Sequence, residues 1–348
     1  MKNLWREGKF EILSDDIGGL PPKEMHLLIK RCGTVSHQSE KSSKKSPEEF
    51  IRMIWRMKHY PVLEHSWFTF FLSSNFEAEK GQIELDLRRG SSLFCITNRK
   101  NGLLLSGNAR IYIEAYLRNP TTTTATLLYF LQNRDPLLFP PELFKVRRDL
   151  VIPYNFIFNP SLKTKKEILT HRAMTVLFSN VSRGFTHEDV RSRNGHNKIA
   201  SYTQRSTRYV DPLKKESFNF ILPYTPKLPE TLQIAEEAYS LQEILIFFAQ
   251  LYRSARNSGL RPEEARQWLP IGIETEIAQT MNLSEWLHWF IIRTQKAAHP
   301  EIRFVACHLL GEIQRRIPNL FSEFTFRTDD DKIPYCVVNI KEEDKFLL

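Results

Sequence analysis

The chain has 348 residues, of which 41% are hydrophobic, 12% are aromatic and 26% are charged. This composition is typical of a globular protein and excludes a collagen-like, a wholly disordered or a transmembrane chain. With 49 Lys and Arg against 40 Asp and Glu, the formal net charge is +9, which suits either a nucleic-acid-binding protein or an enzyme with anionic ligands. Because basic and acidic residues alternate along most amphipathic segments, and no aromatic and basic stacking platform is evident, we expect no nucleic-acid partner.

The four cysteines are scattered along the chain, at Cys32, Cys95, Cys307 and Cys336. They form no Cys-x-x-Cys pair and have no matched histidines, so the sequence predicts neither a zinc site nor a disulfide framework. The first residues lack the apolar core of a signal peptide, and the most apolar stretch, residues 241–252, is too short to span a bilayer. We therefore expect a cytoplasmic protein that binds no metal and no membrane.

Helix start signals occur at four places along the chain. A capping box with proline at the first helical position predicts a helix that begins at Pro47, and the proline at position 61 predicts that this helix ends before His59. In the C-terminal third, a capping box before Leu241 and prolines followed by glutamate at Pro262 and Pro300 predict three more helices. An apolar stripe along the last of these helices predicts that it packs on the core.

The strand signals are fewer and leave two long segments without a clear pattern. Aromatic and β-branched residues at 66–72 and 174–178 predict strands. Between these strands, we interpret residues 76–167 as an insertion that is irregular except for some helix near 109–117. We expect residues 321–348 to form an irregular tail of the same single domain.

Arginines are concentrated in residues 183–209 to an unusual degree. A guanidinium group is a planar fork of donors that binds phosphate or carboxylate through two hydrogen bonds, each contributing about 1.5–3 kcal/mol. Two further arginines lie on predicted helices: Arg266 is in a short helix that a proline terminates, and Arg293 is on a mostly apolar helix. Since burying an unpaired guanidinium costs free energy, we expect a bound anion to pair with it. The pattern therefore predicts an anion-binding pocket.

Three segments together resemble the flavin-dependent thymidylate synthase family. Residues 59–65 read HYPVLEH, residues 183–191 read RGFTHEDVR and residues 199–209 read IASYTQRSTRY. They are similar to the family's motifs G-H-x-S-V-L-E-H, R-G-x-x-H-E-L-V-R-H-R and S-x-x-Q-x-S-x-R-Y, and they occur in the same order. The resemblance covers most of 47–75 and 168–320.

This resemblance implies an α/β fold of the α+β type, with a central antiparallel sheet flanked by helices in a single domain. It also implies a homotetramer whose active sites are shared between subunits. In the implied reaction, methylene from methylenetetrahydrofolate is transferred to C5 of dUMP and reduced by FADH2, and NADPH regenerates the reduced flavin. A protein side chain cannot deliver a hydride, so this chemistry needs the flavin.

The family's functional residues carry over to matching positions of this chain. The resemblance assigns Arg293 and Ser206 to the catalytic centre. No general base is evident next to Ser206, so we interpret this serine as a dUMP ligand rather than a nucleophile. The residues assigned to dUMP are Glu188, Gln204, Ser206, Arg208, Arg266 and Arg293. The residues assigned to FAD are His59, Arg191, Ser192, Arg193, Ile199, Asn282 and His288.

The chain departs from the family in its R-H-R motif, which reads Arg-Ser-Arg at 191–193 and is followed by five extra residues at 194–198. Two alignments are open. In the first, the extra residues bulge outward from an Asn-Gly turn. In the second, the His-Asn-Lys sequence at 196–198 takes the place of the motif. Ser284 also stands where the family commonly has arginine. These departures affect the flavin and folate sites, whereas the residues assigned to the nucleotide phosphate match.

Three alternative functions follow from these observations. The first is a degenerate paralogue that retains nucleotide binding without catalysis. The second is an enzyme that modifies another pyrimidine nucleotide at C5, such as UMP, or that forms a hydroxymethyl product. The third is a basic nucleic-acid-binding protein. Flavin binding, dUMP-dependent NADPH oxidation and the identity of the product distinguish them.

Overall fold

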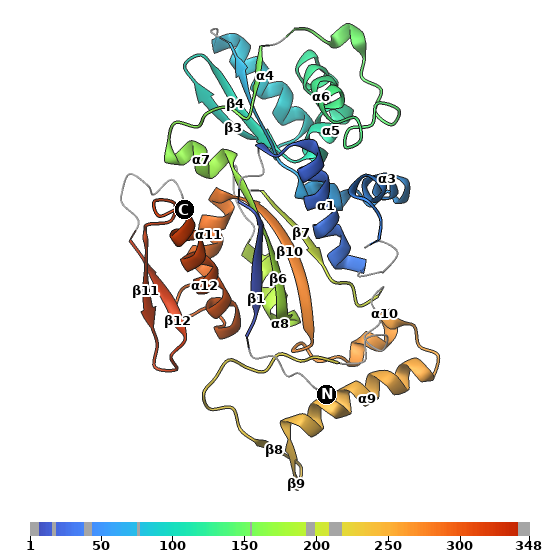
Figure 1. The fold of residues 1–348 in the computed structure, drawn as a ribbon, viewed down its shortest axis with the longest axis vertical. Coiled ribbons are helices and arrows are strands. Elements are labelled where there is room, and N and C mark those ends of the chain that lie inside the picture. Colours follow the sequence, from blue (N-terminus) through green and yellow to red (C-terminus); the bar gives the residue numbers. More distant parts are fainter. Residues whose placement is uncertain are drawn as a thin grey trace.

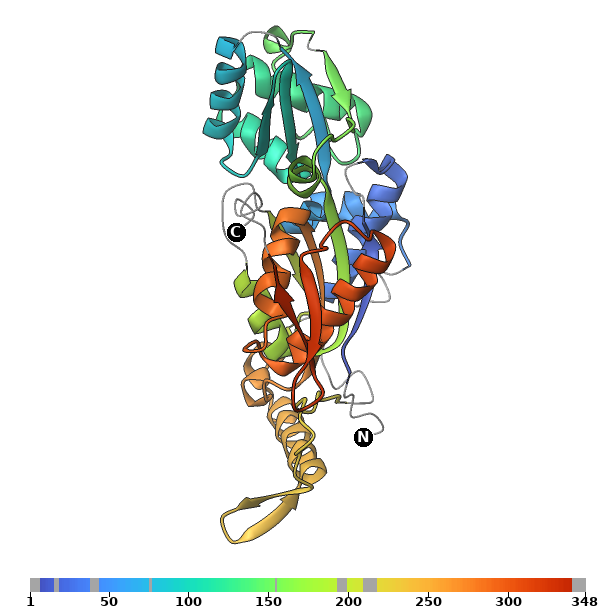
Figure 2. The ribbon, with the colours of Figure 1, turned by 90° about the vertical axis from the view of Figure 1, so that its left-hand side faces the viewer.

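The computed structural model describes residues 7–15, 19–37, 44–74, 77–153, 155–192, 199–208 and 218–339. Within these residues, two four-stranded antiparallel sheets follow one another along the long axis of the molecule, and a helical arm extends from the opposite end (Figures 1 and 2). We call these three parts the core sheet, the second sheet and the arm.

The core sheet has the order β1-β6-β10-β7, and every neighbouring pair is antiparallel. Helix α1 packs on one face, and α8, α11 and α12 pack on the other (Figure 1). Alternate residues of β10 face the two sides, because Ala278 packs in the cluster that contains α1 whereas Ile277 packs in the cluster that contains α11. The expected central antiparallel sheet flanked by helices is confirmed. The elements are β1 (Lys9–Ser14), α1 (Pro22–His37), β6 (Ala173–Ser182), α8 (Arg183–Asp189), η4 (Val190–Ser192), β7 (Ala200–Gln204), β10 (Glu274–Asn282), α11 (Leu283–Arg293) and α12 (Pro300–Arg316).

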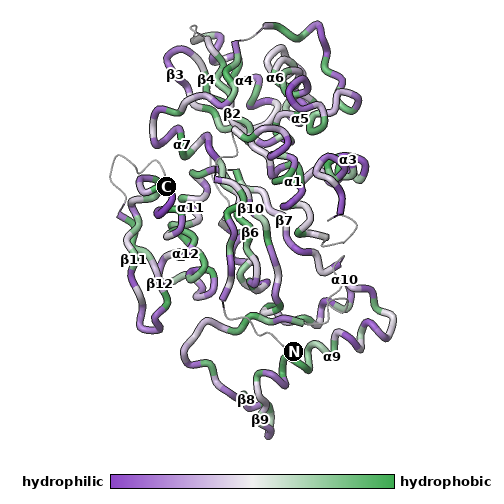
Figure 3. Tube along the Cα trace, in the orientation of Figure 1, coloured by the Kyte–Doolittle hydropathy of each residue, from purple (hydrophilic) through white to green (hydrophobic). Residues whose placement is uncertain are grey.

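Hydrophobic residues concentrate where these elements meet, along β6, β10 and α11 (Figure 3). Trp286 and Trp289 of α11 are both fully buried and pack on Phe178 of β6. Burial of large aromatic side chains contributes about 1.5–3 kcal/mol each. This packing fixes α11 and α8 against the same face of the core sheet.

The second sheet has the order β3-β4-β2-β5 and is covered by helices of its own. The expectation of an irregular segment at 76–167 is therefore wrong, although the helix expected near 109–117 is present as α5. The sequence gives little indication of this sheet, because its strand β4 is buried along its whole length and shows no alternation of polar and apolar residues. The elements are β2 (Phe68–Ser73), α4 (Glu77–Gly90), β3 (Cys95–Arg99), β4 (Gly102–Gly107), α5 (Ala109–Arg118), α6 (Thr122–Arg134), η3 (Arg148–Leu150), β5 (Phe156–Phe158) and α7 (Lys165–His171).

The four helix starts expected from the sequence are all present. Helix α3 (Pro47–Met57) begins with the predicted capping box of Ser46 and ends before His59, and η2 (Tyr60–His65) follows it. The arm consists of a hairpin, β8 (Thr231–Ile234) and β9 (Glu237–Ser240), followed by α9 (Leu241–Asn257), α10 (Pro262–Ala265) and η6 (Arg266–Trp268). Pro262 and Pro300 start α10 and α12 as expected.

The C-terminal segment is a second place where the sequence expectation is wrong. Residues expected to be irregular form a hairpin of β11 (Phe324–Thr328) and β12 (Pro334–Val338). The hairpin is joined to the core because the backbone N–H of Cys336 donates to the carbonyl of Thr294 at 2.8 Å. Because this contact is tertiary, the hairpin could not be predicted from a local sequence pattern.

A buried histidine holds η2 against the core sheet. Nδ1 of His65 lies 2.8 Å from Oγ1 of Thr280 on β10, and its Nε2 lies 2.8 Å from Oγ1 of Thr203 on β7. Burial lowers the pKa of His65 to about 3, so the imidazole is neutral at physiological pH. This contact fixes Glu64, the preceding residue, beside the edge strand β7.

Candidate functional site

Helix α8 carries Glu188, which was predicted to bind dUMP, and the start of this helix is anchored by hydrogen bonds. The hydroxyl oxygen of Ser182 accepts a hydrogen bond from the backbone N–H of Phe185 at 2.9 Å and so caps the helix. The buried carboxylate of Glu301 in turn accepts from the backbone N–H of Ser182 at 2.7 Å. These bonds fix where the side chains of Arg183 and Glu188 leave the helix.

Two arginines from distant parts of the chain meet in one pocket, which we call the arginine pocket. Its volume is about 500 Å³, and it lies where α8, β7 and η6 come together. Nη1 of Arg266 lies 3.3 Å from Oγ1 of Thr207. The lining residues are Arg183, His187, Thr207, Arg266, Gln267, Leu269, Pro270, Ile271 and Ile273.

The arginine pocket is positively charged. Burial lowers the pKa of Arg183, and the neighbouring guanidinium groups of Arg266 and Arg205 lower it further. Nη2 of Arg183 donates to the carbonyl of Arg205 at 2.9 Å, but its Nε is buried without a partner. Within the described part of the chain, neither Arg183 nor Arg266 forms an ion pair with a carboxylate. An anion would therefore find two guanidinium groups available.

Three other residues predicted to bind dUMP lie near this pocket without lining it. Nε2 of Gln204 donates to Oγ1 of Thr186 at 2.7 Å, which ties the end of β7 to α8. Oγ of Ser206 accepts from the backbone N–H of Arg208 at 3.2 Å. The side chain of Arg208 is 58% exposed, and its Nε lies 3.8 Å from a carboxylate oxygen of Glu263. In this chain, Thr207 rather than Ser206 faces the pocket.

Arg293 and Glu188 are brought together as an ion pair. Nη1 of Arg293 donates to Oε2 of Glu188 at 2.9 Å, and Nη2 donates to the backbone carbonyl of Glu188. Arg293 is only 9% exposed, and burial lowers its pKa. The other carboxylate oxygen of Glu188 lies 3.4 Å from Arg191. Helix α8 therefore presents Arg183 to the arginine pocket and Glu188 to Arg293.

Asp189 is a buried carboxyl group that the sequence analysis missed. It is fully buried beside this ion pair, and Nε1 of Trp289 donates to its Oδ1 at 2.8 Å. Burial raises the pKa of Asp189 to about 7. The hydrogen bond from Trp289 and the charge of Arg293 lower this pKa, but burial has the larger effect. Asp189 directly follows Glu188 in the predicted motif, but only the packing of α8 on α11 reveals its burial.

The residues predicted to bind FAD are distributed over two faces of the core sheet. His59 lies between α3 and η2, on the face that carries α1, whereas His288 lies on α11, on the opposite face. Arg191 has a side chain that is 72% exposed. Imidazole and guanidinium donors suit a flavin and its pyrophosphate, but His59 and His288 lie on opposite faces of the core sheet within one chain. The side chain of Ser192, and Arg193 with the extra residues 194–198, lie outside the described residues.

Asn282, also predicted to bind FAD, is fully buried and caps α11. Its Oδ1 accepts from the backbone N–H of Glu285 at 3.3 Å and of Ile199 at 3.2 Å. Its Nδ2 donates to the carbonyl of Thr170 at 3.1 Å. Asn282 therefore holds the backbone of Ile199, the residue from which β7 continues.

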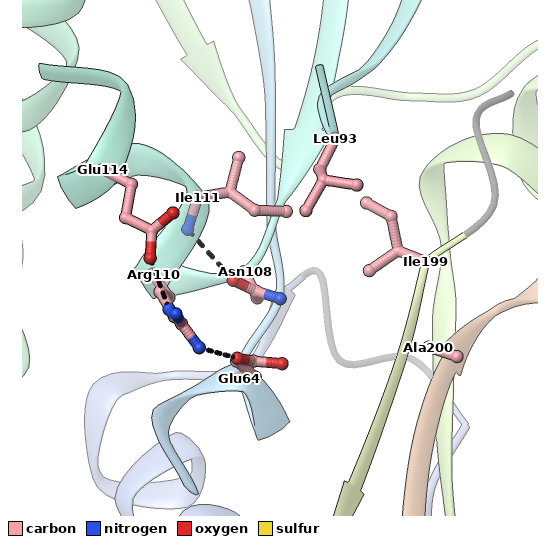
Figure 4. Close-up of a pocket in the computed structure, with 8 residues that line it drawn as sticks. All are labelled: Glu64, Leu93, Asn108, Arg110, Ile111, Glu114, Ile199 and Ala200. Atoms are coloured by element: carbon pink, nitrogen blue, oxygen red, sulfur yellow. Dashed lines mark hydrogen bonds and ion pairs between the residues drawn. The ribbon is translucent and has the colours of Figure 1, made fainter. Parts of the chain in front are cut away.

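Ile199 lines a second pocket, which we call the junction pocket because it lies between the core sheet and the second sheet (Figure 4). Its volume is about 330 Å³. Nη1 of Arg110 donates to Oε1 of Glu64 at 2.6 Å, and Nε of Arg110 donates to Glu114 at 2.5 Å. The lining residues are Glu64, Leu93, Asn108, Arg110, Ile111, Glu114, Ile199 and Ala200.

Among the described residues, no group of three or more His, Cys, Asp or Glu side chains is arranged to hold a metal ion. None of the described helices combines the length and apolarity that a bilayer crossing needs.

Comparison with known proteins finds a family to which part of the chain is similar. The family described as thymidylate synthase complementing protein matches residues 155–319. This range includes α8, β7, η6 and α11, the elements that supply the arginine pocket and the Arg293–Glu188 pair. Residues 155–319, which are slightly less than half of the chain, are similar to this family.

Individual curated relatives match less than half of the chain. A flavin-dependent thymidylate synthase from Pyrococcus furiosus is 36% identical over 152 residues, which are 43% of this chain and 58% of that protein. A flavin-dependent thymidylate synthase from Geobacter sulfurreducens is 32% identical over 159 residues, which are 45% of this chain and 63% of that protein. The chain thus spans less than two thirds of the length of each of these curated relatives.

A solved structure is similar over most of the chain at low sequence identity. The UMP/dUMP methylase PolB from Streptomyces cacaoi, bound with 5-Br UMP, aligns with a TM-score of 0.38 and 13% identity. The alignment covers 91% of this chain and 93% of that one.

Proposed function

We propose that this protein is a flavin-dependent thymidylate synthase. It methylates dUMP at C5 to form dTMP, with methylenetetrahydrofolate as carbon donor and FADH2, regenerated by NADPH, as hydride donor. The observation that carries the proposal is the arginine pocket: Arg183 and Arg266 meet there without carboxylate partners among the described residues, inside the part of the chain that matches the family.

In this proposal, the arginine pocket holds the phosphate of dUMP. Arg266 and Arg183 supply charge-assisted hydrogen bonds, and Arg208 adds another when its exposed side chain leaves Glu263. Gln204 and Ser206 position the sugar. Arg293 polarises a carbonyl of the uracil ring, and Glu188 orients that guanidinium through their ion pair. Ser206 remains a ligand rather than a nucleophile.

When bound, FAD supplies the hydride, because no protein side chain can donate one. His59, Arg191, Ser192, Arg193, Ile199 and His288 are the residues we propose to hold it, and Asn282 contributes by fixing the backbone of Ile199. Because His59 and His288 lie on opposite faces of the core sheet, we propose that copies of the chain complete each flavin site together. The exposed apolar residues of the arm support assembly, since Phe247 is 59% exposed and Ile234 is 50% exposed.

The altered R-H-R motif keeps two alternatives open: a catalytically inactive relative that retains nucleotide binding, and an enzyme that acts on another pyrimidine nucleotide. Titration of the purified protein with FAD, followed by dUMP, separates the first from the proposal. We expect an oxidised-flavin absorption spectrum that shifts when dUMP is added, because the pyrimidine ring and the flavin occupy one site. Absence of flavin uptake with dUMP present would count against the proposal and in favour of the inactive relative.

A further inference from the structure

Asp189 places a carboxyl group where the motif that this segment resembles has an apolar side chain. Residues 183–191 resemble the first nine positions of the motif R-G-x-x-H-E-L-V-R-H-R, and Asp189 stands at its leucine. Asp189 is fully buried in this chain. Burying a carboxyl group costs free energy unless its neighbours pair with it. The side chains around Asp189 therefore indicate what this carboxyl group does.

Two uncharged side chains contact the carboxyl group of Asp189 from neighbouring elements. Nε1 of Trp289 on α11 donates to its Oδ1 at 2.8 Å. One end of the buried side-chain amide of Gln279, on β10, lies 2.8 Å from both carboxyl oxygens. With its nitrogen at that end, the amide donates to a carboxylate. With its oxygen there, it accepts from a protonated carboxyl group, and Nε2 then lies 3.4 Å from Sδ of Met281. Gln279 can therefore pair with Asp189 in either protonation state.

Arg293 couples Asp189 to the Arg293–Glu188 pair. Nη2 of Arg293 donates to the backbone carbonyl of Glu188, which belongs to the peptide bond that joins Glu188 to Asp189. The charge of Arg293 lowers the pKa of Asp189, and the charge of Asp189 raises the pKa of Arg293. Both side chains are buried, so water screens this interaction only weakly. The charge of Asp189 therefore changes the electrostatic potential at the guanidinium group.

The other charged groups near α8 are held by partners of their own. Glu301 on α12 accepts from the N–H and the hydroxyl of Ser182 at the start of the helix, and Arg191 on η4 pairs with Glu188. Strand β10 faces Asp189 with the uncharged Gln279, and β6 carries no titratable side chain. The charged or titratable side chains on α8, or in contact with it from η4, α11 and α12, include Arg183, His187, Glu188, Arg191, Arg293 and Glu301.

We propose that Asp189 is a positioning residue whose proton sets how strongly Arg293 polarises the uracil ring. When Asp189 is neutral, the guanidinium retains more of its positive charge for the uracil carbonyl. When Asp189 is charged, its carboxylate adds to that of Glu188 and offsets the guanidinium further, so negative charge that develops on the ring is stabilised less. The identity of the ring rests on the proposed function, whereas the coupling of Asp189 to Arg293 does not.

The first test follows the ionisation of Asp189 through the stability of the full chain, without any measurement of activity. Burial raises the pKa of Asp189 from its ordinary value of 3.8 to about 7. The neutral group therefore stabilises the folded state at low pH, and this contribution is lost as the pH rises through about 7. Between about pH 5 and about pH 8, the unfolding equilibrium constant of Asp189→Asn, divided by that of the unaltered chain, should fall by about tenfold to a hundredfold. An equal ratio at both pH values would overturn the proposal.

The second test repeats this comparison in a chain that carries Arg293→Gln. The charge that lowers the pKa of Asp189 is then absent, so the midpoint of the pH dependence should move to higher pH. An unchanged midpoint would show that Asp189 and Arg293 are not coupled and would overturn the proposal. Asp86→Asn is the matched control, because Asp86 is a buried aspartate of α4 that accepts from Gln82 and Thr123. It should leave the midpoint unchanged.

The third test measures kcat for dUMP-dependent NADPH oxidation as a function of pH, with all substrates saturating. In the unaltered chain, kcat should fall by about threefold to tenfold as Asp189 ionises. Asp189→Asn should lack this fall, and so should Asp189→Leu, which restores the residue of the motif, whereas Asp86→Asn should retain it. The same fall in the two Asp189 variants would assign Asp189 a purely structural role and overturn the proposal. If no chain formed dTMP, the proposed function would fail, and the midpoint with Arg293→Gln would still decide whether the two groups are coupled.

Discussion

Replacing Arg266 with alanine is expected to weaken the binding of dUMP by about tenfold to a hundredfold, as measured by isothermal titration calorimetry. Arg266 shares the arginine pocket with Arg183 and forms no ion pair with a carboxylate in the described part of the chain. One charge-assisted hydrogen bond to the phosphate would be lost, which contributes about 1.5–3 kcal/mol. Deoxyuridine, which lacks the phosphate, should bind the variant and the unaltered chain with the same affinity.

The matched control for this prediction is Arg315→Ala. Arg315 is an exposed arginine at the end of α12 that pairs with Glu312, three residues earlier on the same helix. Its removal changes the net charge by the same amount and should leave dUMP affinity within about twofold. If Arg266→Ala bound dUMP as tightly as the unaltered chain, the phosphate site would lie elsewhere.

Replacing Glu188 with alanine is expected to lower the free energy of unfolding by about 2–4 kcal/mol. The change leaves the guanidinium of Arg293, which is only 9% exposed, without this carboxylate. Breaking a fully buried pair costs about 3–5 kcal/mol, and the expected loss is smaller because the side chain of Glu188 is 33% exposed. Denaturant unfolding followed by tryptophan fluorescence measures the change, since Trp289 packs beside this pair.

Glu263→Ala is the control for the stability measurement. Glu263 faces two exposed arginines, Arg208 at 3.8 Å and Arg261 at 3.4 Å, so its removal should cost less than about 1 kcal/mol. Glu188→Gln should fall between the two, because the amide oxygen can still accept from Arg293. Equal stabilities of Glu188→Ala and Glu263→Ala would show that the Arg293–Glu188 pair does not hold α8 to α11.

The helix starts could be predicted from the sequence because the signals that specify them are local. Ser46 caps α3 and Ser240 caps α9, and each side chain bonds to a backbone N–H three residues further on. The second sheet could not be predicted in this way. Its strand β2 pairs with β4 and β5, which are far away in sequence, and the buried strand β4 lacks the alternation that identifies a strand.

For the candidate site too, the sequence predicts what depends on residue type and order, but not what depends on tertiary packing. The arginines and their order along the chain predict an anion-binding pocket. Arg183 and Arg266 do line one pocket, and its binding of an anion stays a prediction. The partners of individual residues depend on tertiary packing. Asn282, for which contact with flavin stays a prediction, caps α11 from a fully buried position. The burial of Asp189 is recognisable only once α11 covers it.

The proposed activity is tested most directly by identifying the product formed from dUMP. The purified chain would be incubated with FAD, NADPH, methylenetetrahydrofolate and dUMP, and the nucleotides would be analysed by mass spectrometry. We predict dTMP, formed together with NADPH oxidation that depends on dUMP, and no dTMP with Arg293→Ala. Formation of a different C5-modified nucleotide, or unchanged dUMP from a chain that has bound flavin, would contradict the assignment as a thymidylate synthase.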